Sequence, residues 1–181
     1  MQFTLREQLT AAIFAGIIAA LSPITIPFGL IPMTLQTFAV GLTVTILGAK
    51  NGTWAVLIYL LLGLLGLPVF AGGTAGIGVL FGPTGGFLIG FIFNGLLTGW
   101  LVEKMHYSYL GGFLGNILGA FVTLLFGTLW LKLSTEMNWL GAFNAGMVPF
   151  LLPGVIKAVA AGGIGIMIHN RLSSYLLRLN K

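Results

Sequence analysis

Three long stretches without a charged residue, 8–49, 51–102 and 107–131, set the main constraint on this chain. A water-soluble domain carries roughly 25% charged residues, whereas here the fraction is 6% and the mean hydropathy is +1.06. The net charge of +5 comes without any Lys/Arg cluster, so a nucleic-acid surface is not expected. The sequence therefore predicts a polytopic protein that folds inside a lipid bilayer.

The apolar stretches are continuous rather than alternating, which indicates helices. A transmembrane barrel would show segments of alternating polarity, whereas runs such as Leu60-Leu61-Leu62 have none. A span needs about 20 residues, so the chain has room for about six. We expect an all-α bundle of six transmembrane helices that forms a single integral-membrane domain over residues 1–181. The first helix is expected to be retained rather than cleaved, because Glu7 lies beside Arg6 and no polar domain follows.

Glycine, proline and charged residues mark the expected helix ends. The helices are predicted at 5–21, 33–49, 53–70, 84–104, 108–133 and from 148 to the C-terminus. A tight polar turn at 50–52, a proline-rich segment at 22–32, a glycine-rich segment at 71–83 and a polar stretch around 134–138 connect them.

The charges sort by side in a six-helix bundle. Lys132 and Glu136 would lie on one face, and the remaining basic ends and turns would lie on the other. The second group consists of Arg6, Lys50, Lys104, Arg171, Arg178 and Lys181. Because basic residues favour the cytoplasmic side, both termini are predicted to be cytoplasmic.

The connections on the external face are long and uncharged. Segments 24–32 and 71–83 are apolar enough to pack into the protein. Non-helical backbone at membrane depth is tolerated only where protein covers it or where it lines a cavity. We therefore expect a pocket in the outer half of the bundle, covered by these two segments.

Lys157 is the most informative charge, because it lies a turn or two inside the sixth helix. An ionisable residue within a span faces the interior or a cavity. No acidic residue is near it in sequence, so an anionic ligand would be its partner. The alternative is a lysine whose stem reaches the membrane surface.

Several uncharged polar residues are also predicted inside the bundle. They can contact a polar ligand or bond a neighbouring helix, and the sequence leaves both open. These residues are Thr34, Gln36 and Thr37 at the start of the second helix, and Asn94 and Asn116 in the fourth and fifth.

Small residues repeat every fourth position along the first helix and give it a smooth face. Such a face lets another helix approach closely, either from this chain or from a partner. The residues are Ala11, Ala15 and Ala19 and, beside them, Ala12, Gly16 and Ala20. Glycine stripes at 82, 86, 90 and at 111, 115, 119 are more typical of packing within the bundle.

Several chemistries lack the residues that they need. The G-x-x-x-x-G-K-[ST] phosphate loop is absent, so the chain cannot hydrolyse ATP by itself. Neither G-x-S-x-G nor H-E-x-x-H occurs. The three glutamates lie at span ends, which argues against a proton relay, and there is no cysteine. We expect no enzyme, no metal site and no cofactor.

Four strings occur in a characteristic order: Pro-Met-Thr-Leu-Gln-Thr-Phe at 32–38, Tyr-Leu-Leu-Leu-Gly-Leu-Leu-Gly-Leu-Pro-Val-Phe at 59–70, Gly-Pro-Thr-Gly-Gly-Phe at 82–87 and Pro-Gly-Val-Ile-Lys at 153–157. Together they resemble the BioY family, the biotin-binding S components of energy-coupling-factor (ECF) transporters. The resemblance covers nearly the whole chain.

The resemblance implies a six-helix protein with both termini inside, in the cytoplasmic membrane of a prokaryote. It would capture biotin from outside, as a transported ligand rather than a cofactor, and work with a transmembrane T component and two ATPases. In that family the alanine-rich first helix docks on the T component. This role would pass to Ala11, Ala12, Ala15, Gly16, Ala19 and Ala20.

The resemblance also suggests which residues contact the ligand. Lys157 would attract the carboxylate or bond the ureido oxygen. Gln36, Thr34 and Asn94 are the polar candidates, and the candidates for the wall and for the start of the fourth helix are Phe70, Gly72, Gly73, Thr84 and Phe87. Two positions depart from the family pattern: Gly154 stands where an Asp is usual, and Phe87 where Tyr is common.

Three rival functions remain open. The motifs argue against a binding subunit for another vitamin, whereas the missing Asp argues slightly for it. A channel or facilitator would need a continuous polar path, of which the cytoplasmic half offers little beyond Asn116. An intramembrane enzyme would need a nucleophile and a base, and the sequence offers no such pair.

Overall fold

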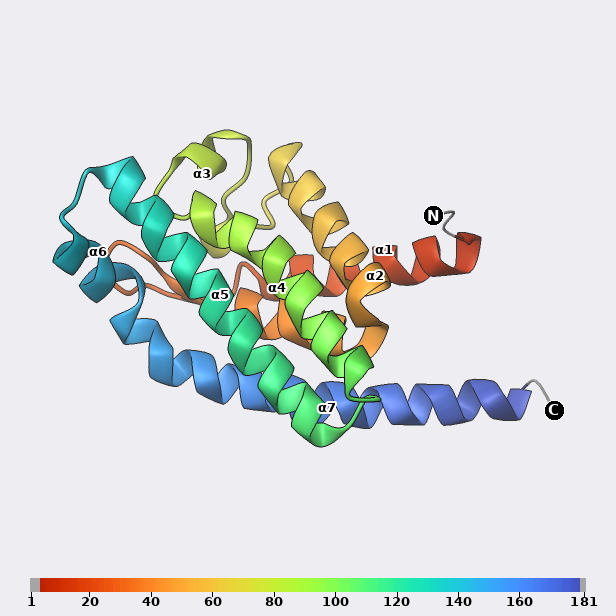
Figure 1. Cartoon of the computed structure of the whole chain (residues 1–181). Helices are drawn as coiled ribbons and strands as arrows, with labels where there is room; N and C mark the ends of the chain where they lie inside the picture. The colour runs from red at the N-terminus through yellow and green to blue at the C-terminus, as the bar shows by residue number, and fades with distance from the viewer. Residues whose placement is uncertain (1–3, 180–181) are drawn as a thin grey trace.

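Long apolar helices pack side by side and leave most of their connections at one end (Figure 1). The computed structural model describes residues 4–179. Lys181 and the side chain of Arg178, which belong to the predicted basic C-terminus, lie outside what it describes. The helices are α1 (Leu5–Leu21), α2 (Gln36–Leu64), α3 (Gly78–Phe81), α4 (Gly85–Lys104), α5 (Tyr109–Thr135), α6 (Trp139–Gly146) and α7 (Val148–Leu179), with a 3₁₀ turn η1 (Ala71–Gly73).

α2 consists of two helical arms, 36–47 and 49–64, joined by a reversal at Gly48. Gly48 has φ 80° and ψ −176°, which no helix contains. A Cβ built on Gly52 would lie 2.7 Å from the Cα of Val44. Residues eight positions apart on a straight helix are separated by about 12 Å, so the two arms must fold back on each other. The predicted turn at 50–52 is wrong in detail, because these residues already belong to the second arm.

The segment before α2 is a short antiparallel ribbon rather than helix. β1 (Thr25–Ile26) pairs with β2 (Met33–Thr34), with Thr25 opposite Thr34. The predicted helix start at Met33 is therefore wrong, and α2 begins at Gln36. The Thr34 hydroxyl accepts a hydrogen bond from the Gln36 backbone N–H at 3.1 Å, which stabilises the change from strand to helix.

Two further helix boundaries differ from the prediction. The second arm of α2 ends at Leu64 rather than Phe70, because Gly66 takes a φ of 105° and Pro68 follows it. The unassigned stretch after residue 138 forms α6, whose N-terminus is capped by the Asn138 side chain. The fourth and fifth helices are confirmed to within two residues at each end.

The glycine stripes pack α4 against α5, as predicted, except at Gly82, which precedes α4, and at Gly111, which contacts the turn before α5. A Cβ on Gly90 would lie 3.0 Å from the Thr123 Cα, and one on Gly115 would lie 3.1 Å from the Thr98 carbonyl oxygen. The two backbones thus approach as closely as glycine allows, a device common between membrane helices.

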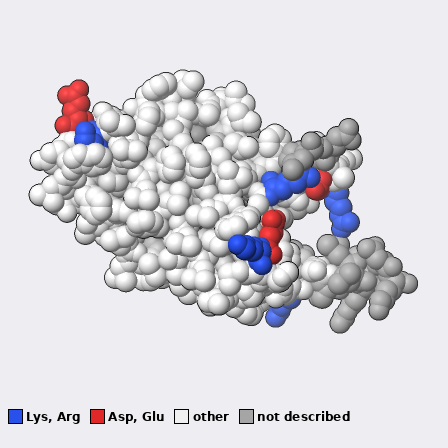
Figure 2. Space-filling view, viewed as in Figure 1, with Lys and Arg blue, Asp and Glu red and all other residues white. Residues whose placement is uncertain are grey.

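The surface is that of a membrane protein. On the face shown in Figure 2, charged side chains appear only towards the two ends, and the broad middle is uncharged. Among the described residues, four helices are long and apolar enough to cross a membrane: Gln36–Leu64, Gly85–Lys104, Tyr109–Thr135 and the α6–α7 region Trp139–Ser173. Many large apolar side chains are exposed along them, as a lipid-facing surface requires.

Candidate ligand-binding site

A cavity lies among the helix ends on the side of the connecting segments. It encloses ≈ 670 Å³, counting the open space at its mouth. Its walls are mainly apolar with a few polar groups, which is typical of sites for small organic molecules. The apolar side chains on its walls are those of Ile31, Pro32, Phe70, Ala71, Val79, Phe87, Leu88, Phe91, Ala120, Leu124 and Phe150.

The structure brings most of the predicted ligand residues to this cavity. Those that line it are Lys157, Gln36, Thr34, Phe70, Thr84 and Phe87. Gly72 and Gly73 follow the lining residue Ala71 but are themselves exposed in the η1 turn. Asn94 is buried and is not part of the wall. Residues of both connecting segments, 24–32 and 71–83, line the cavity, so the structure contains a pocket at the expected place.

Lys157 is turned into the protein. Its Nζ donates a hydrogen bond to the backbone carbonyl of Thr34 at 3.0 Å. Among the described residues that line the cavity, it is the only one that carries a charge. Gly154, one turn earlier on α7, also lines the wall, and no heavy atom lies within 4 Å of a Cβ built there. The lysine is therefore held by a neutral backbone acceptor in a chain that has no Asp at residue 154.

Gln36 contributes a buried amide from the first turn of α2. Its Nε2 donates to the Tyr59 hydroxyl at 2.6 Å, and its Oε1 accepts from the Thr34 hydroxyl at 3.3 Å. A terminal amide has two N–H donors and two acceptor lone pairs. These two bonds therefore leave one donor and one lone pair for a ligand.

Thr37, whose role the sequence left open between a ligand contact and a bond to a neighbouring helix, lines the cavity. Its Oγ1 is buried in the wall, and no hydrogen-bond partner for it is found within the described part of the chain. Burying an unpaired hydroxyl is unfavourable, so such a group is typical of a site that completes its bonds with a ligand. The available signal was its place in the string 32–38, beside Gln36.

Asn94 serves helix packing instead. Its Nδ2 donates to the Thr123 hydroxyl at 3.1 Å, and its Oδ1 accepts from Thr98 at 2.9 Å. Asn116 does the same deeper in the bundle, donating to the Thr45 hydroxyl at 2.7 Å. Of the two interpretations left open by the sequence, the bond to a neighbouring helix applies to both asparagines.

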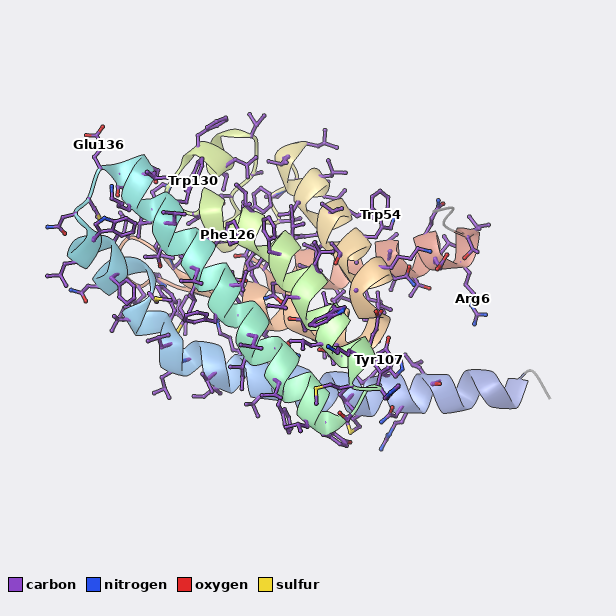
Figure 3. The ribbon with its side chains drawn as sticks, in the orientation of Figure 1. Arg6, Trp54, Tyr107, Phe126, Trp130 and Glu136 are labelled. Atoms are coloured by element: carbon purple, nitrogen blue, oxygen red, sulfur yellow. The ribbon has the colours of Figure 1, made fainter. Side chains whose placement is uncertain are left out.

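The segment 65–84 covers one side of the cavity and is fixed at two points. Phe70 is almost completely buried, and its ring lies where a Cβ on Gly63 would be. At the other end, Trp130 on α5 donates its indole N–H to the Gly82 carbonyl at 3.0 Å. Figure 3 shows Trp130 beside this segment, at the upper end of α5.

The opposite end of the bundle is closed by polar contacts. The Glu103 carboxylate accepts from the Ala49 backbone N–H at 2.8 Å, just after the reversal in α2. His169 on α7 lies 2.7 Å from the Ile46 carbonyl, and its ring stacks on Tyr107 with centroids 3.5 Å apart. Burial raises the pKa of Tyr107, so its phenol stays neutral in this turn.

The small residues of α1 divide into two faces. Ala11 and Ala15 are fully buried and pack within the bundle, so they cannot belong to a docking surface. Ala12, Gly16 and Ala20 are exposed, and Ala19 is half-buried. Packing within the bundle therefore explains the face with Ala11 and Ala15. The docking prediction now applies only to the exposed face with Ala12, Gly16 and Ala20.

Fold and site together define a membrane-embedded small-molecule binding protein. The fold follows a crystal structure described as the S-component for biotin from an ECF-type ABC transporter, with a TM-score of 0.83 and 26% sequence identity, covering 93% of this chain and 95% of that one. The sequence model of the BioY family matches residues 1–174. The chain belongs to the BioY family, which confirms the resemblance carried by the four strings.

Curated relatives agree over nearly the full length. The biotin transporter BioY2 of Lactococcus lactis subsp. cremoris is 47% identical over 174 residues, covering 96% of each chain. The biotin transporter BioY of Thermotoga maritima is 38% identical over 164 residues, covering 91% of this chain and 96% of that one. The chain is thus a multi-pass membrane protein of a transporter family, not an enzyme.

Proposed function

We propose that this chain captures biotin in the cavity as the S component of an ECF-type importer. The observation that carries the proposal is Lys157, a lone cation turned into an apolar cavity and bonded only to a neutral carbonyl in the part of the chain that the structure describes. Such a group within a membrane bundle is typical of a ligand site.

The chemistry of biotin matches the wall. Its rings and aliphatic chain suit the aromatic and aliphatic residues, and its ureido group needs neutral donors and acceptors such as Gln36, Thr34 and Thr84. Lys157 would exchange the Thr34 carbonyl for a stronger acceptor on the ligand, either the carboxylate or the ureido oxygen. Bonds to a charged acceptor are roughly twice as strong as neutral ones.

We further propose six membrane-spanning segments with cytoplasmic termini. Counting the two arms of α2 separately gives six helical segments of 12 or more residues within residues 4–179, and α1 begins at the same end of the molecule at which α7 ends (Figure 1). Arg6 and Tyr107 lie towards that end, and Glu136 lies at the other (Figure 3). Basic residues favour the cytoplasmic side, so the cavity would open outside.

The exposed face of α1, defined by Ala12, Gly16 and Ala20, would dock a transmembrane T component that works with two ATPases. The chain has no phosphate loop of its own. Release of a tightly bound ligand requires a second state that binds it less well. A partner that binds this face would supply that state.

Equilibrium binding by the purified chain tests the proposed ligand. A panel of biotin, riboflavin, thiamine and folate should show saturable binding of biotin alone, with one molecule per chain. Comparing biotin with its carboxamide then identifies the group that Lys157 contacts, because only a carboxylate contact makes Lys157→Ala lower affinity for biotin more than for the carboxamide. Tight binding of another vitamin would favour the rival S-component function.

A matched pair of substitutions tests the docking face. Gly16→Leu adds bulk where nothing lies within 4 Å of a Cβ, so binding by the isolated chain should be unchanged. Uptake into liposomes containing the T component, both ATPases and ATP should be lost. Ala15→Leu, one residue away but buried, should instead lower the thermal stability of the isolated chain. Accumulation of biotin by the chain alone, driven by an ion gradient, would contradict the importer proposal.

A further inference from the structure

A chain of hydrogen bonds runs from Lys157 to the covering segment through three neighbouring elements. Lys157 donates to the Thr34 carbonyl, and the Thr34 hydroxyl donates to Gln36 Oε1. Gln36 Nε2 donates to the Tyr59 hydroxyl at 2.6 Å, which donates to the Val69 carbonyl at 3.3 Å. The chain thus joins α7, β2, both arms of α2 and the segment that covers the cavity.

The direction of the bonds between Val69 and Thr34 follows from the Val69 end, because Lys157 bonds the carbonyl of Thr34 and not its hydroxyl. An ammonium group can only donate, and a backbone carbonyl can only accept. Because the Tyr59 hydroxyl donates its single proton to the Val69 carbonyl, its oxygen must accept the hydrogen bond from Gln36. Ser22 also faces the Tyr59 hydroxyl, but its own proton goes to the Ile18 carbonyl at 2.6 Å, so it too offers only an acceptor.

Tyr59 therefore decides which way the Gln36 amide points. With Nε2 held at Tyr59 and Oε1 held at Thr34, the amide keeps one N–H and one lone pair for the cavity, each at a fixed place. A cyclic urea offers the complementary pair, an N–H and a carbonyl oxygen side by side. A carboxylate offers acceptors only and would leave the Gln36 oxygen without a donor.

We propose that Tyr59, which does not line the cavity, is a positioning residue for recognition of the ligand's ureido group. The inference rests on the proposed function, because the ureido group belongs to the proposed ligand. The hydroxyl and the ring have separable roles: the ring is fully buried and packs edge-on against Phe70, with centroids 5.7 Å apart. Tyr59→Phe removes the hydroxyl and keeps that packing.

The test compares two ligands on one preparation of protein. 2-Iminobiotin carries a cyclic guanidine in place of the urea, so at neutral pH this group is a cation that donates where biotin accepts. The added charge is the same for both proteins, so only the change in preference between wild type and Tyr59→Phe is interpreted. The wild-type chain should prefer biotin. In Tyr59→Phe the amide is free to turn over, so affinity for biotin should fall by about 2- to 12-fold, the equivalent of one net hydrogen bond. Affinity for 2-iminobiotin should fall less or rise, which lowers the preference for biotin.

The ratio of the two dissociation constants does not depend on the folded fraction, because both are measured on the same sample. Gln36→Met provides a second variant that should lose the same preference, and adding Tyr59→Phe to it should change nothing further. Equal losses for both ligands, an unchanged preference in Tyr59→Phe, or additive effects in the double variant would each overturn the role of Tyr59. A wild-type chain that binds neither ligand would instead contradict the proposed function itself.

Discussion

Gln36 and Asn94 are both buried side-chain amides within the bundle, yet they lie in regions that use them differently. Gln36 faces the cavity and keeps a donor and a lone pair free. Asn94 lies between α4 and α5, where Thr98 and Thr123 bond both ends of its amide. Each amide thus donates one hydrogen bond and accepts one, and the cavity end around Gln36 differs from the packed half around Asn94 in access. The donor and lone pair that remain on Gln36 lie at the cavity wall, whereas those of Asn94 are enclosed within the bundle.

Glycine accounts for much of the difference between the two regions. In the packed half, Gly99 brings the backbone of α4 against Ala49, and Gly162 brings α7 against the backbone of Gly112. At the cavity end, the chain leaves helical geometry, and aromatic side chains such as Phe70, Phe87 and Phe150 keep the elements apart. Close backbone contact removes the space that a ligand needs, whereas irregular segments and large side chains create it.

The largest expected effect on ligand affinity comes from removing the charge in the cavity. Lys157→Ala should weaken biotin binding by about 2–5 kcal/mol, because a desolvated partner of the lysine is left unpaired. Isothermal titration in detergent measures the change. Lys132→Ala is the matched control, since it removes the same charge from the end of α5, outside the cavity wall. Full affinity in a folded Lys157→Ala protein would show that the lysine does not contact the ligand.

The packed half should respond in stability rather than in binding. Gly99→Val places methyl groups against the Ala49 backbone, and overpacking of this kind costs about 1–3 kcal/mol. Thermal unfolding should shift downwards, while affinity per folded molecule stays the same. Gly16→Val, in open space on α1, is the control. A selective loss of affinity in Gly99→Val would show that the two regions are not independent.

A smaller effect is expected at the cover of the cavity. Trp130→Phe removes the bond to the Gly82 carbonyl and should cost about 0.5–1.5 kcal/mol of affinity. The loss should appear as faster dissociation, because the segment 65–84 is held less firmly. Stopped-flow displacement measures this rate, and Trp100→Phe on the exposed side of α4 is the control. An unchanged rate would mean that this segment does not limit ligand release.

The sequence predicted the helices better than the site, for physical reasons. Apolar length and charge define spans directly, so α4 and α5 were placed within two residues. The reversal at Gly48 was predicted two residues late, at 50–52, because the polar residues Lys50 and Asn51 follow the glycine that turns the chain. Lys157 was predictable because a lone charge in a span demands a partner. The different roles of Gln36 and Asn94 were not, since each depends on residues far away in the chain, Tyr59 and Thr123.

The most direct test of the account compares Gln36→Met with Asn94→Leu, measuring biotin affinity and thermal stability for both proteins. Gln36→Met should lower affinity by about 1–3 kcal/mol, as expected where a ligand's polar groups lose their partner, beyond any loss of stability from its bonds to Thr34 and Tyr59. Asn94→Leu should lower stability by about 0.6–1.7 kcal/mol, the range for interhelical hydrogen bonds in a membrane, and leave affinity unchanged. Equal effects of the two substitutions on affinity would contradict the division between the cavity end and the packed half.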